Sequence, residues 1–225
     1  MSVTLNAVLP MMAGFAAARG ESWGVTNYLD EGLQANVRSD GGVTARSLHR
    51  MEGLLERAVE GQVDAVLLTC TVFSPHIASF RARFPLPIIG ADVAMLDKAA
   101  GLHRRTAILC TFSASLATSL EMLRRAAERI GAPCEAEAFL VDGALEAMAA
   151  GDRARHDDLV VASAKAHAQN FDALVLAQMS MAGAADQLTA CGVPVLTSPN
   201  CAIDAVRKAI DRRRAALAGL LQPED

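Results

Sequence analysis

Short runs of apolar residues alternate along the chain with longer amphipathic stretches, a pattern typical of strands that alternate with helices. The run at 63–69 is almost continuously apolar, as expected for a strand in a parallel sheet covered on both faces. The stretch 45–59 places its apolar side chains on one helical face. We therefore expect an α/β fold with parallel sheets. The pattern also predicts strands at 3–9, 87–90, 106–110, 134–141, 173–177 and 194–197, and helices at 75–83, 93–100, 115–130 and 152–170.

The chain contains two copies of one sequence unit. Residues 64–72 read Asp-Ala-Val-Leu-Leu-Thr-Cys-Thr-Val, and residues 172–180 read Asp-Ala-Leu-Val-Leu-Ala-Gln-Met-Ser. The two segments align without a gap at an offset of 108, so Gln178 stands where the first copy has Cys70. Other segments repeat in the same way: 106–110 matches 4–8, and 194–197 matches 87–90.

This repeat predicts two pseudo-symmetric lobes, each a parallel sheet flanked by helices, with an active-site cleft between them. We expect the first lobe to contain residues 1–98 and 205–225 and the second to contain residues 99–204. The helix after Asp204 is assigned to the first lobe because its counterpart at 94–100 lies at the crossover between the copies.

Composition and charge exclude several classes of protein. The 225 residues are 52% hydrophobic and 20% charged, which is not the composition of a disordered chain. The net charge is −4, and the longest basic cluster is 212–214, which we interpret as a solvated helix face, so no nucleic-acid partner is expected. The apolar stretch 8–18 contains Pro10 and Gly14, and we interpret it as a strand end and loop rather than as a signal peptide. No run approaches the roughly 20 apolar residues of a membrane span, so no membrane partner is expected.

The cysteines and histidines indicate neither a disulfide framework nor a metal site. Five cysteines is an odd number and no C-x-x-C pair occurs, so a reduced, cytoplasmic location is expected. The five histidines show no metal-ligand spacing, and we expect no metal. Sequences of the type that bind phosphates or dinucleotides through glycine-rich loops are also absent. The oligomeric state stays open, and a homo-oligomer is compatible with the sequence.

Polar residues follow the predicted strands, where ligands bind in open parallel sheets. Cys70 ends one strand, and a helix is predicted to begin soon after it. Backbone N–H groups at such a start lower the pKa of a thiol, and a thiolate there can carry a proton or attack carbon. An isolated cysteine is more often a small buried apolar residue, but the repeat and the Thr-Cys-Thr context favour a site. Gln178 can donate and accept hydrogen bonds but cannot shuttle a proton at neutral pH.

Four segments resemble those of a known family: Leu-Leu-Thr-Cys-Thr at 67–71, Arg-Arg-Thr-Ala-Ile-Leu-Cys-Thr-Phe-Ser-Ala-Ser-Leu at 104–116, Leu-Ala-Gln-Met-Ser-Met-Ala at 176–182 and Pro-Val-Leu-Thr-Ser-Pro at 194–199. Through them nearly the whole chain resembles the aspartate/glutamate/hydantoin racemase superfamily, which includes arylmalonate decarboxylase and maleate isomerase. The resemblance implies two pseudo-symmetric α/β lobes, a cleft between them, no cofactor and no metal.

Racemases of that superfamily use one cysteine from each half as opposed acid and base. Cys70 matches the first, and the position that matches the second is Gln178. Decarboxylases of the superfamily have a single cysteine on the second side, so this chain follows neither pattern. The resemblance also implies that Thr71, Thr111 and Ser113 bind a substrate carboxylate. Met179 and Ser180, directly after Gln178, complete the expected substrate-binding set.

The sequence thus predicts a cofactor-independent enzyme acting next to the carboxylate of a small acid, of racemase or isomerase type. Cys70 is expected to be the nucleophile or sole acid–base group, with Gln178 orienting the opposite face. Two alternatives stay open: a one-thiol decarboxylase, and a catalytically silent protein that binds small acids. Whether Cys110 or Cys201 provides a second acid–base group is open as well.

Overall fold

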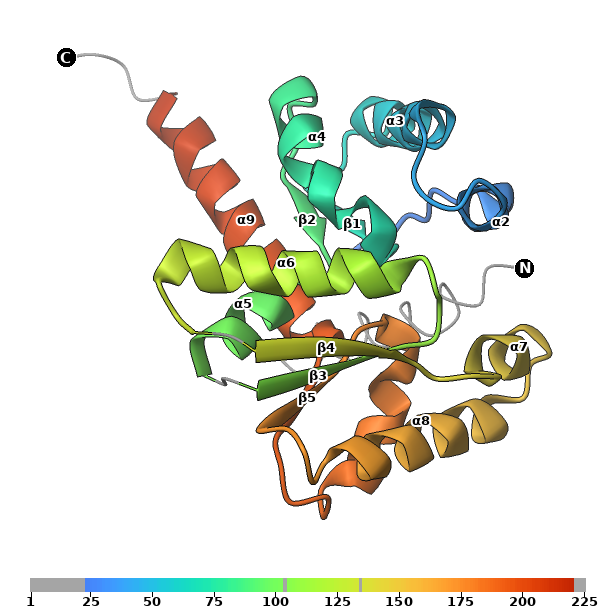
Figure 1. Ribbon diagram of the computed structural model, residues 1–225. Coiled ribbons are helices and arrows are strands. Elements are labelled where there is room, and N and C mark those ends of the chain that lie inside the picture. The colour runs from blue at the N-terminus through green and yellow to red at the C-terminus, as the bar shows by residue number, and fades with distance from the viewer. Residues whose placement is uncertain (1–22, 103–104, 134, 221–225) are drawn as a thin grey trace.

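The strands form two separate sheets, and every pairing within them is parallel (Figure 1). The computed structural model describes residues 23–102, 105–133 and 135–220. The first sheet pairs β1 (Val66–Leu68) with β2 (Ile88–Gly90). The second has the order β4-β3-β5-β6, with β3 (Arg105–Cys110), β4 (Glu135–Leu140), β5 (Ala173–Leu176) and β6 (Val195–Thr197). The predicted α/β class with parallel sheets is confirmed.

Helices cover both sheets and make up most of the remaining described chain. They are α2 (Glu31–Ser39), α3 (Ala45–Glu60), η1 (Thr71–His76, a 3-10 helix), α4 (Ile77–Arg83), α5 (Val93–Leu102), α6 (Ser115–Ile130), α7 (Ala144–Ala149), α8 (Arg153–His167), η2 (Met179–Leu188, 3-10) and α9 (Ser198–Leu220). Among the described residues, no helix is both long and apolar enough to cross a membrane.

The predicted helix bounds hold where local signals mark the ends. The helix predicted at 115–130 is α6, which ends at Gly131 in the left-handed conformation that glycine adopts freely. Helix α3 begins where Thr44 and Ser47 form a capping box. The helix predicted at 152–170 ends three residues early, at His167.

Three helical segments were not predicted, namely α2, α7 and η2. Helix α2 buries only Leu33 and Val37 and presents polar side chains elsewhere, so its apolar signal is weak. Asp30 caps its N-terminus by accepting a hydrogen bond from the N–H of Gly32. The predicted helix at 75–83 instead begins as the 3-10 turn η1, four residues earlier.

The two copies of the sequence unit form equivalent strand pairs. Val66 pairs with Ile88 in the first sheet, and their counterparts Leu174 and Val195 pair in the second. A 3-10 helix follows the first strand of each pair, beginning at Thr71 and at Met179, again 108 residues apart. The repeat therefore extends from the sequence to the register of the sheets.

The helix after each second strand crosses to the other sheet. Helix α5 follows β2 but contacts β5 and β6, whereas α9 follows β6 but contacts β1 and β2. Arg213 of α9 donates hydrogen bonds to the carbonyl oxygens of Val63 (3.1 Å) and Asp64 (2.9 Å), just before β1. Part of the 212–214 cluster thus anchors the helix, which corrects the interpretation of that cluster as a solvated face. The lobe boundaries at 98/99 and 204/205 stay predictions.

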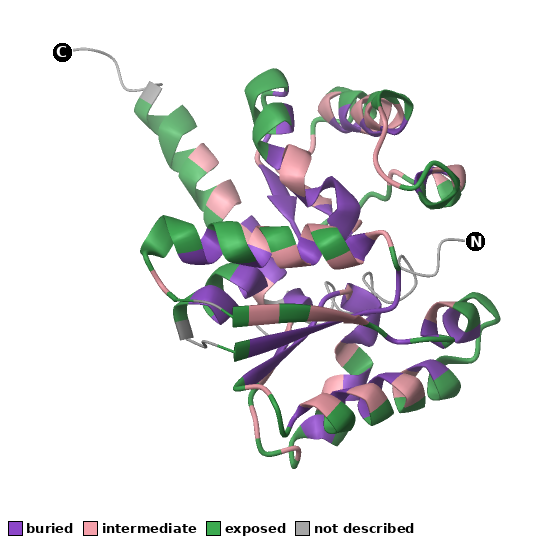
Figure 2. Ribbon diagram, in the orientation of Figure 1, coloured by how far each residue is buried: buried purple, intermediate pink, exposed green. Residues whose placement is uncertain are grey.

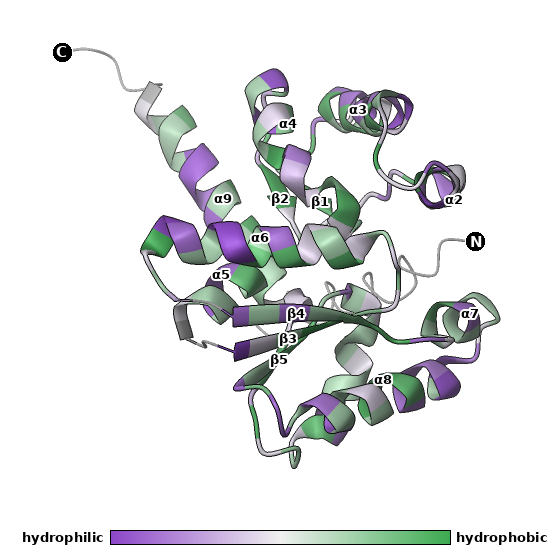
Figure 3. Ribbon diagram, viewed as in Figure 1, coloured by the Kyte–Doolittle hydropathy of each residue, from purple (hydrophilic) through white to green (hydrophobic). Residues whose placement is uncertain are grey.

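Apolar side chains gather into a core around each sheet, with β2, β5 and most of β3 buried, whereas the edge strand β4 and the outer helix faces are exposed or half-buried (Figure 2). The hydropathy of helix α3 differs between its two faces (Figure 3). Phe112, just after β3, packs in the core of the first sheet with Phe73 and Val72. The loop that follows β3 is thereby held against the first half of the molecule. The predicted strand at 3–9 and the segment 8–18 lie outside the described residues.

Candidate functional site

Cys70 and Asp92 lie at the same level, beyond the carboxyl ends of neighbouring strands. Leu68 of β1 pairs with Gly90 of β2. Cys70 stands two positions after Leu68, and Asp92 stands two positions after Gly90. The N–H of Ala91 donates to the carbonyl of Leu68 (2.9 Å), which continues the ladder past the strand ends. Ser74 of η1 donates a hydrogen bond of 2.6 Å from its hydroxyl to the Asp92 carboxyl. This edge of the first sheet thus carries a thiol, a hydroxyl and a carboxyl group.

Cys70 begins the 3-10 helix η1, and its carbonyl accepts the N–H of Phe73 (3.1 Å). Burial raises the pKa of the Cys70 thiol to about 11, the hydrogen bond from the N–H of Val72 lowers it, and the charge of Asp92 raises it. The expectation of a lowered pKa is therefore wrong. The predicted N–H groups are present, but the loss of solvent outweighs them. The thiol is neutral at neutral pH, so we expect its alkylation at neutral pH to be slow.

The amide of Gln178 bonds to the loop after β3 with both of its ends. Its Oε1 accepts the N–H of Thr111 (2.8 Å), and its Nε2 donates to the hydroxyl of Ser115 (2.8 Å). That hydroxyl donates in turn to the carbonyl of Phe112 (2.6 Å). Gln178 therefore satisfies polar groups of a loop more than 60 residues away in the sequence.

Cys110 lies beside this network at the end of β3 and is fully buried. Burial raises the pKa of its thiol, which Ser115, Ser119 and Gln178 lower by hydrogen bonding. The thiol contacts the hydroxyl of Ser119 at 3.9 Å. Cys201, on α9, also has a raised pKa through burial, which the positive charge of Lys98 partly offsets. Neither thiol is thus a ready base at neutral pH.

The other predicted residues differ in their exposure. Thr71 and Thr111 are buried, and Ser113 is exposed in the turn before α6. Met179 and Ser180 begin η2 and are buried, Met179 in a cluster that includes Ala91. The structure thus gathers the predicted residues into two groups, one around Cys70 and Thr71 and one around Gln178.

Sequence reasoning missed Asp92, Ser74 and Arg38. The guanidinium of Arg38, on α2, lies 5.6 Å from the centre of the ring of Phe112, the residue between Thr111 and Ser113 in the sequence. Asp92 had a usable signal, because it follows the predicted strand at 87–90 as the other polar residues follow theirs. No comparable sequence signal marks Arg38.

Gly90 of β2 allows side chains of η1, α4 and α5 to approach the strand closely. A Cβ atom at this position would lie 2.5 Å from Ile77 Cδ1, 2.8 Å from Val93 Cγ2 and 3.2 Å from Ser74 Oγ. Alanine would therefore push apart the segments that hold Ser74 and Asp92.

We predict that Gly90→Ala lowers the free energy of unfolding by about 1–3 kcal/mol through overpacking. Gly53→Ala is the matched control, because Gly53 lies within α3 and an added Cβ atom there would meet no neighbouring atom within 4 Å. That control is expected to be neutral or stabilising by up to about 1 kcal/mol. Urea unfolding monitored by circular dichroism measures both, and equal stability of the two variants would contradict the prediction.

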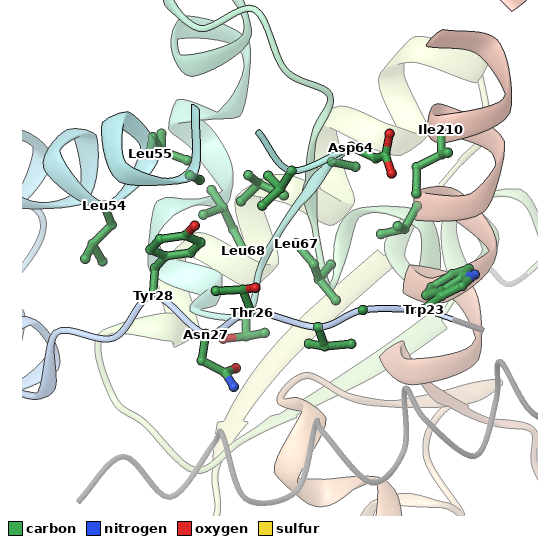
Figure 4. Close-up of a pocket in the computed structure, with 18 of the residues that line it drawn as sticks. Trp23, Thr26, Asn27, Tyr28, Leu54, Leu55, Asp64, Leu67, Leu68 and Ile210 are labelled. Atoms are coloured by element: carbon green, nitrogen blue, oxygen red, sulfur yellow. The ribbon is translucent and has the colours of Figure 1, made fainter. Parts of the chain in front are cut away.

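A cavity of about 750 Å³ extends along the edge of β1 that faces away from β2 (Figure 4). It is lined by Tyr28, Leu55, Leu67 and Ile210 among others, and Cys70 stands at its border. Of the predicted site residues, only Cys70 lines this cavity, so we do not place the substrate site in it.

In the described part of the chain, no group of three or more His, Cys, Asp or Glu side chains is placed to hold a metal ion. The features that carry chemistry are instead a thiol and an amide at equivalent positions of a duplicated parallel α/β unit. This arrangement defines the class of protein as a duplicated α/β protein with polar side chains beyond its strand ends.

The chain belongs to the Asp/Glu/Hydantoin racemase family, whose model matches residues 25–206. Its structure is similar to an aspartate racemase from Picrophilus torridus, with a TM-score of 0.69, 13% identity, and coverage of 93% of this chain and 91% of that one. An allantoin racemase from Pseudomonas fluorescens has a TM-score of 0.64 and 15% identity, with 94% and 88% covered. A glutamate racemase from Thermus thermophilus has a TM-score of 0.56 and 21% identity, with 99% and 80% covered. No curated protein sequence matches the chain.

Proposed function

We propose that the protein is a cofactor-independent enzyme of racemase or isomerase type that acts on the carbon next to the carboxylate of a small acid. The observation that carries this proposal is the equivalence of Cys70 and Gln178, which are the N-cap residues of the 3-10 helices η1 and η2 in a racemase-family fold. Cys70 is the group that carries the proton. Thr71, Thr111, Ser113, Met179 and Ser180 bind the substrate, and Gln178 keeps the loop after β3 in place. The family and the four free described cysteines support a cytoplasmic location.

Racemisation without a cofactor removes a proton on one face of the carbon and delivers a proton on the other. The group that removes the proton and the group that delivers one must each change protonation state, and an amide does not do so at neutral pH. The amide of Gln178 is also fully engaged with Thr111 and Ser115. The site therefore favours proton transfer on one face.

A one-thiol decarboxylase is the second candidate, and the raised pKa of Cys70 favours it. In that reaction the bond between the α-carbon and one carboxylate breaks, carbon dioxide leaves, and the electron pair stays on the substrate as an enediolate. Cys70 then donates its proton to the α-carbon and becomes a thiolate, which takes a proton from water. A neutral thiol is the form that this step needs.

The test is incubation in D₂O with a panel of small 2-substituted acids and substituted malonates, with α-deuterium followed by NMR and released carbon dioxide measured separately. We expect stereospecific exchange or decarboxylation of at least one member, without useful racemisation of aspartate or glutamate. Two-way racemisation by the wild type would refute the one-thiol argument and point to Cys110 or Cys201. Binding without any turnover across the panel would favour the binding protein instead.

The pH profile distinguishes the two roles of Cys70. If the neutral thiol donates the proton, the rate falls as pH rises through about 11, where the thiol ionises. If the thiolate abstracts a proton, the rate rises with pH, about tenfold per unit, until that value.

A further inference from the structure

The candidate site contains a buried carboxyl group that the proposed chemistry does not use. Asp92 is 1% exposed, and its Oδ1 accepts the 2.6 Å hydrogen bond from Ser74. Its Oδ2 is buried and, within the described part of the chain, accepts no hydrogen bond. A buried carboxyl oxygen without a donor is costly, so its presence calls for a physical reason.

The sheet fixes where this carboxyl group lies. Because Leu68 and Gly90 are strand partners, Asp92 and Cys70 project from equivalent positions beyond two adjacent parallel strands. Ser74 joins them, since it belongs to the helix that Cys70 begins and bonds to Asp92. The tight packing at Gly90 holds these segments together.

We propose that Asp92 is a positioning residue of this site, which controls the protonation of the Cys70 thiol through its own charge. The inference rests on the proposed function only for the role of Cys70 in catalysis. Ionised Asp92 and a Cys70 thiolate would place two negative charges beyond adjacent strand ends in a region with little solvent, which is unfavourable. Ionised Asp92 therefore disfavours the Cys70 thiolate.

The ionisation of Asp92 falls in a useful range for such control. Burial raises the pKa of its carboxyl to about 6, against the lowering effect of the Ser74 hydroxyl and of the N–H groups of Asp92 and Val93. Its charge raises the pKa values of two thiols, Cys70 after β1 and Cys110 at the end of β3. The thiol of Cys201 responds instead to Lys98 and Asp204. Below pH 6 Asp92 is neutral and no longer raises the pKa of Cys70, whereas above pH 6 the carboxylate adds to the effect of burial on that pKa.

The experiment follows the alkylation rate of Cys70 by iodoacetamide from about pH 5 to pH 9, read by peptide mass spectrometry, in the wild type and in Asp92→Asn. The side chain of Cys70 is partly exposed, and the measurement needs no substrate. At the acidic end we expect equal rates, because Asp92 is then neutral in both proteins. The variant should become about 3–10-fold faster above neutral pH, with the change centred near pH 6.

A purely structural effect of the substitution would change the rate by the same factor at every pH. Such a constant ratio, or a slower variant at alkaline pH, would overturn the proposal. Ser74→Ala gives an independent test, because loss of its hydrogen bond raises the pKa of Asp92 and should move the inflection in the Cys70 rate to higher pH. The alkylation of Cys191 in the same samples is the internal control. Failure of the turnover assay with success here would reject the proposed function and leave this inference in place.

Discussion

Replacement of Cys70 by alanine is expected to abolish turnover of the small acid, with a loss of about 10²–10⁴-fold or more. The argument rests on the two positions equivalent in the repeat, where the second holds an amide that cannot replace the thiol in proton transfer. Of the other thiols near the site, Cys110 is fully buried, and Cys201 lies on α9 at neither of the two equivalent positions. Among the residues that the structure describes, we therefore expect no other cysteine to replace Cys70.

Cys191→Ala is the matched control for that experiment. The thiol of Cys191 donates to the carbonyl of Val193 at 3.3 Å, in the connection before β6 and outside the two groups of site residues. We expect the control to keep wild-type turnover within about twofold. The rates of both variants are measured with the substrate found in the D₂O panel, and thermal melting checks that each is folded. A folded Cys70→Ala protein with more than about a tenth of the activity would show that another group carries the proton.

Replacement of Gln178 by cysteine is expected to change both stability and chemistry. The substitution removes the acceptor of the Thr111 N–H and the donor to Ser115, which leaves part-buried groups of the loop without their partners. An unsatisfied group of this kind costs about 1–3 kcal/mol, so we expect the melting temperature to fall by about 2–10 °C. The new thiol stands at the position equivalent to Cys70 in the repeat. We expect it to introduce or raise racemisation of an accepted substrate.

Gln178→Ala separates these two effects, since it loses the same hydrogen bonds without adding a thiol. Equal losses of stability in the two variants, with racemisation in the cysteine variant alone, would support a second acid–base group at this position. The readouts are thermal melting and the enantiomeric composition of the substrate after incubation. Racemisation in the alanine variant as well would assign the effect to the loosened loop, and its absence in both would contradict the geometry inferred from the repeat.

Local sequence signals were sufficient for most elements around the candidate site. Helix α6 follows from its apolar periodicity and from Gly131, and strand β3 follows from its apolar run. Helix α2 was missed because only two of its residues are buried, so that its stability depends on contacts that a short polar segment does not reveal. The ion pair between Arg50 of α3 and Asp30, which caps α2, is one of them.

By itself the sequence determined the duplicated parallel α/β unit, the equivalence of Cys70 and Gln178 and the family, because these depend on the order of residue types along the chain. Only the tertiary structure decided the protonation of Cys70, the loop contacts of Gln178 and the place of Asp92. Each of these depends on the exclusion of solvent or on a partner distant in sequence, such as Thr111, which lies 67 residues from Gln178. The effect of helix N–H groups on a thiol is local and could be anticipated, but the larger effect of burial arises only when the chain has packed around it.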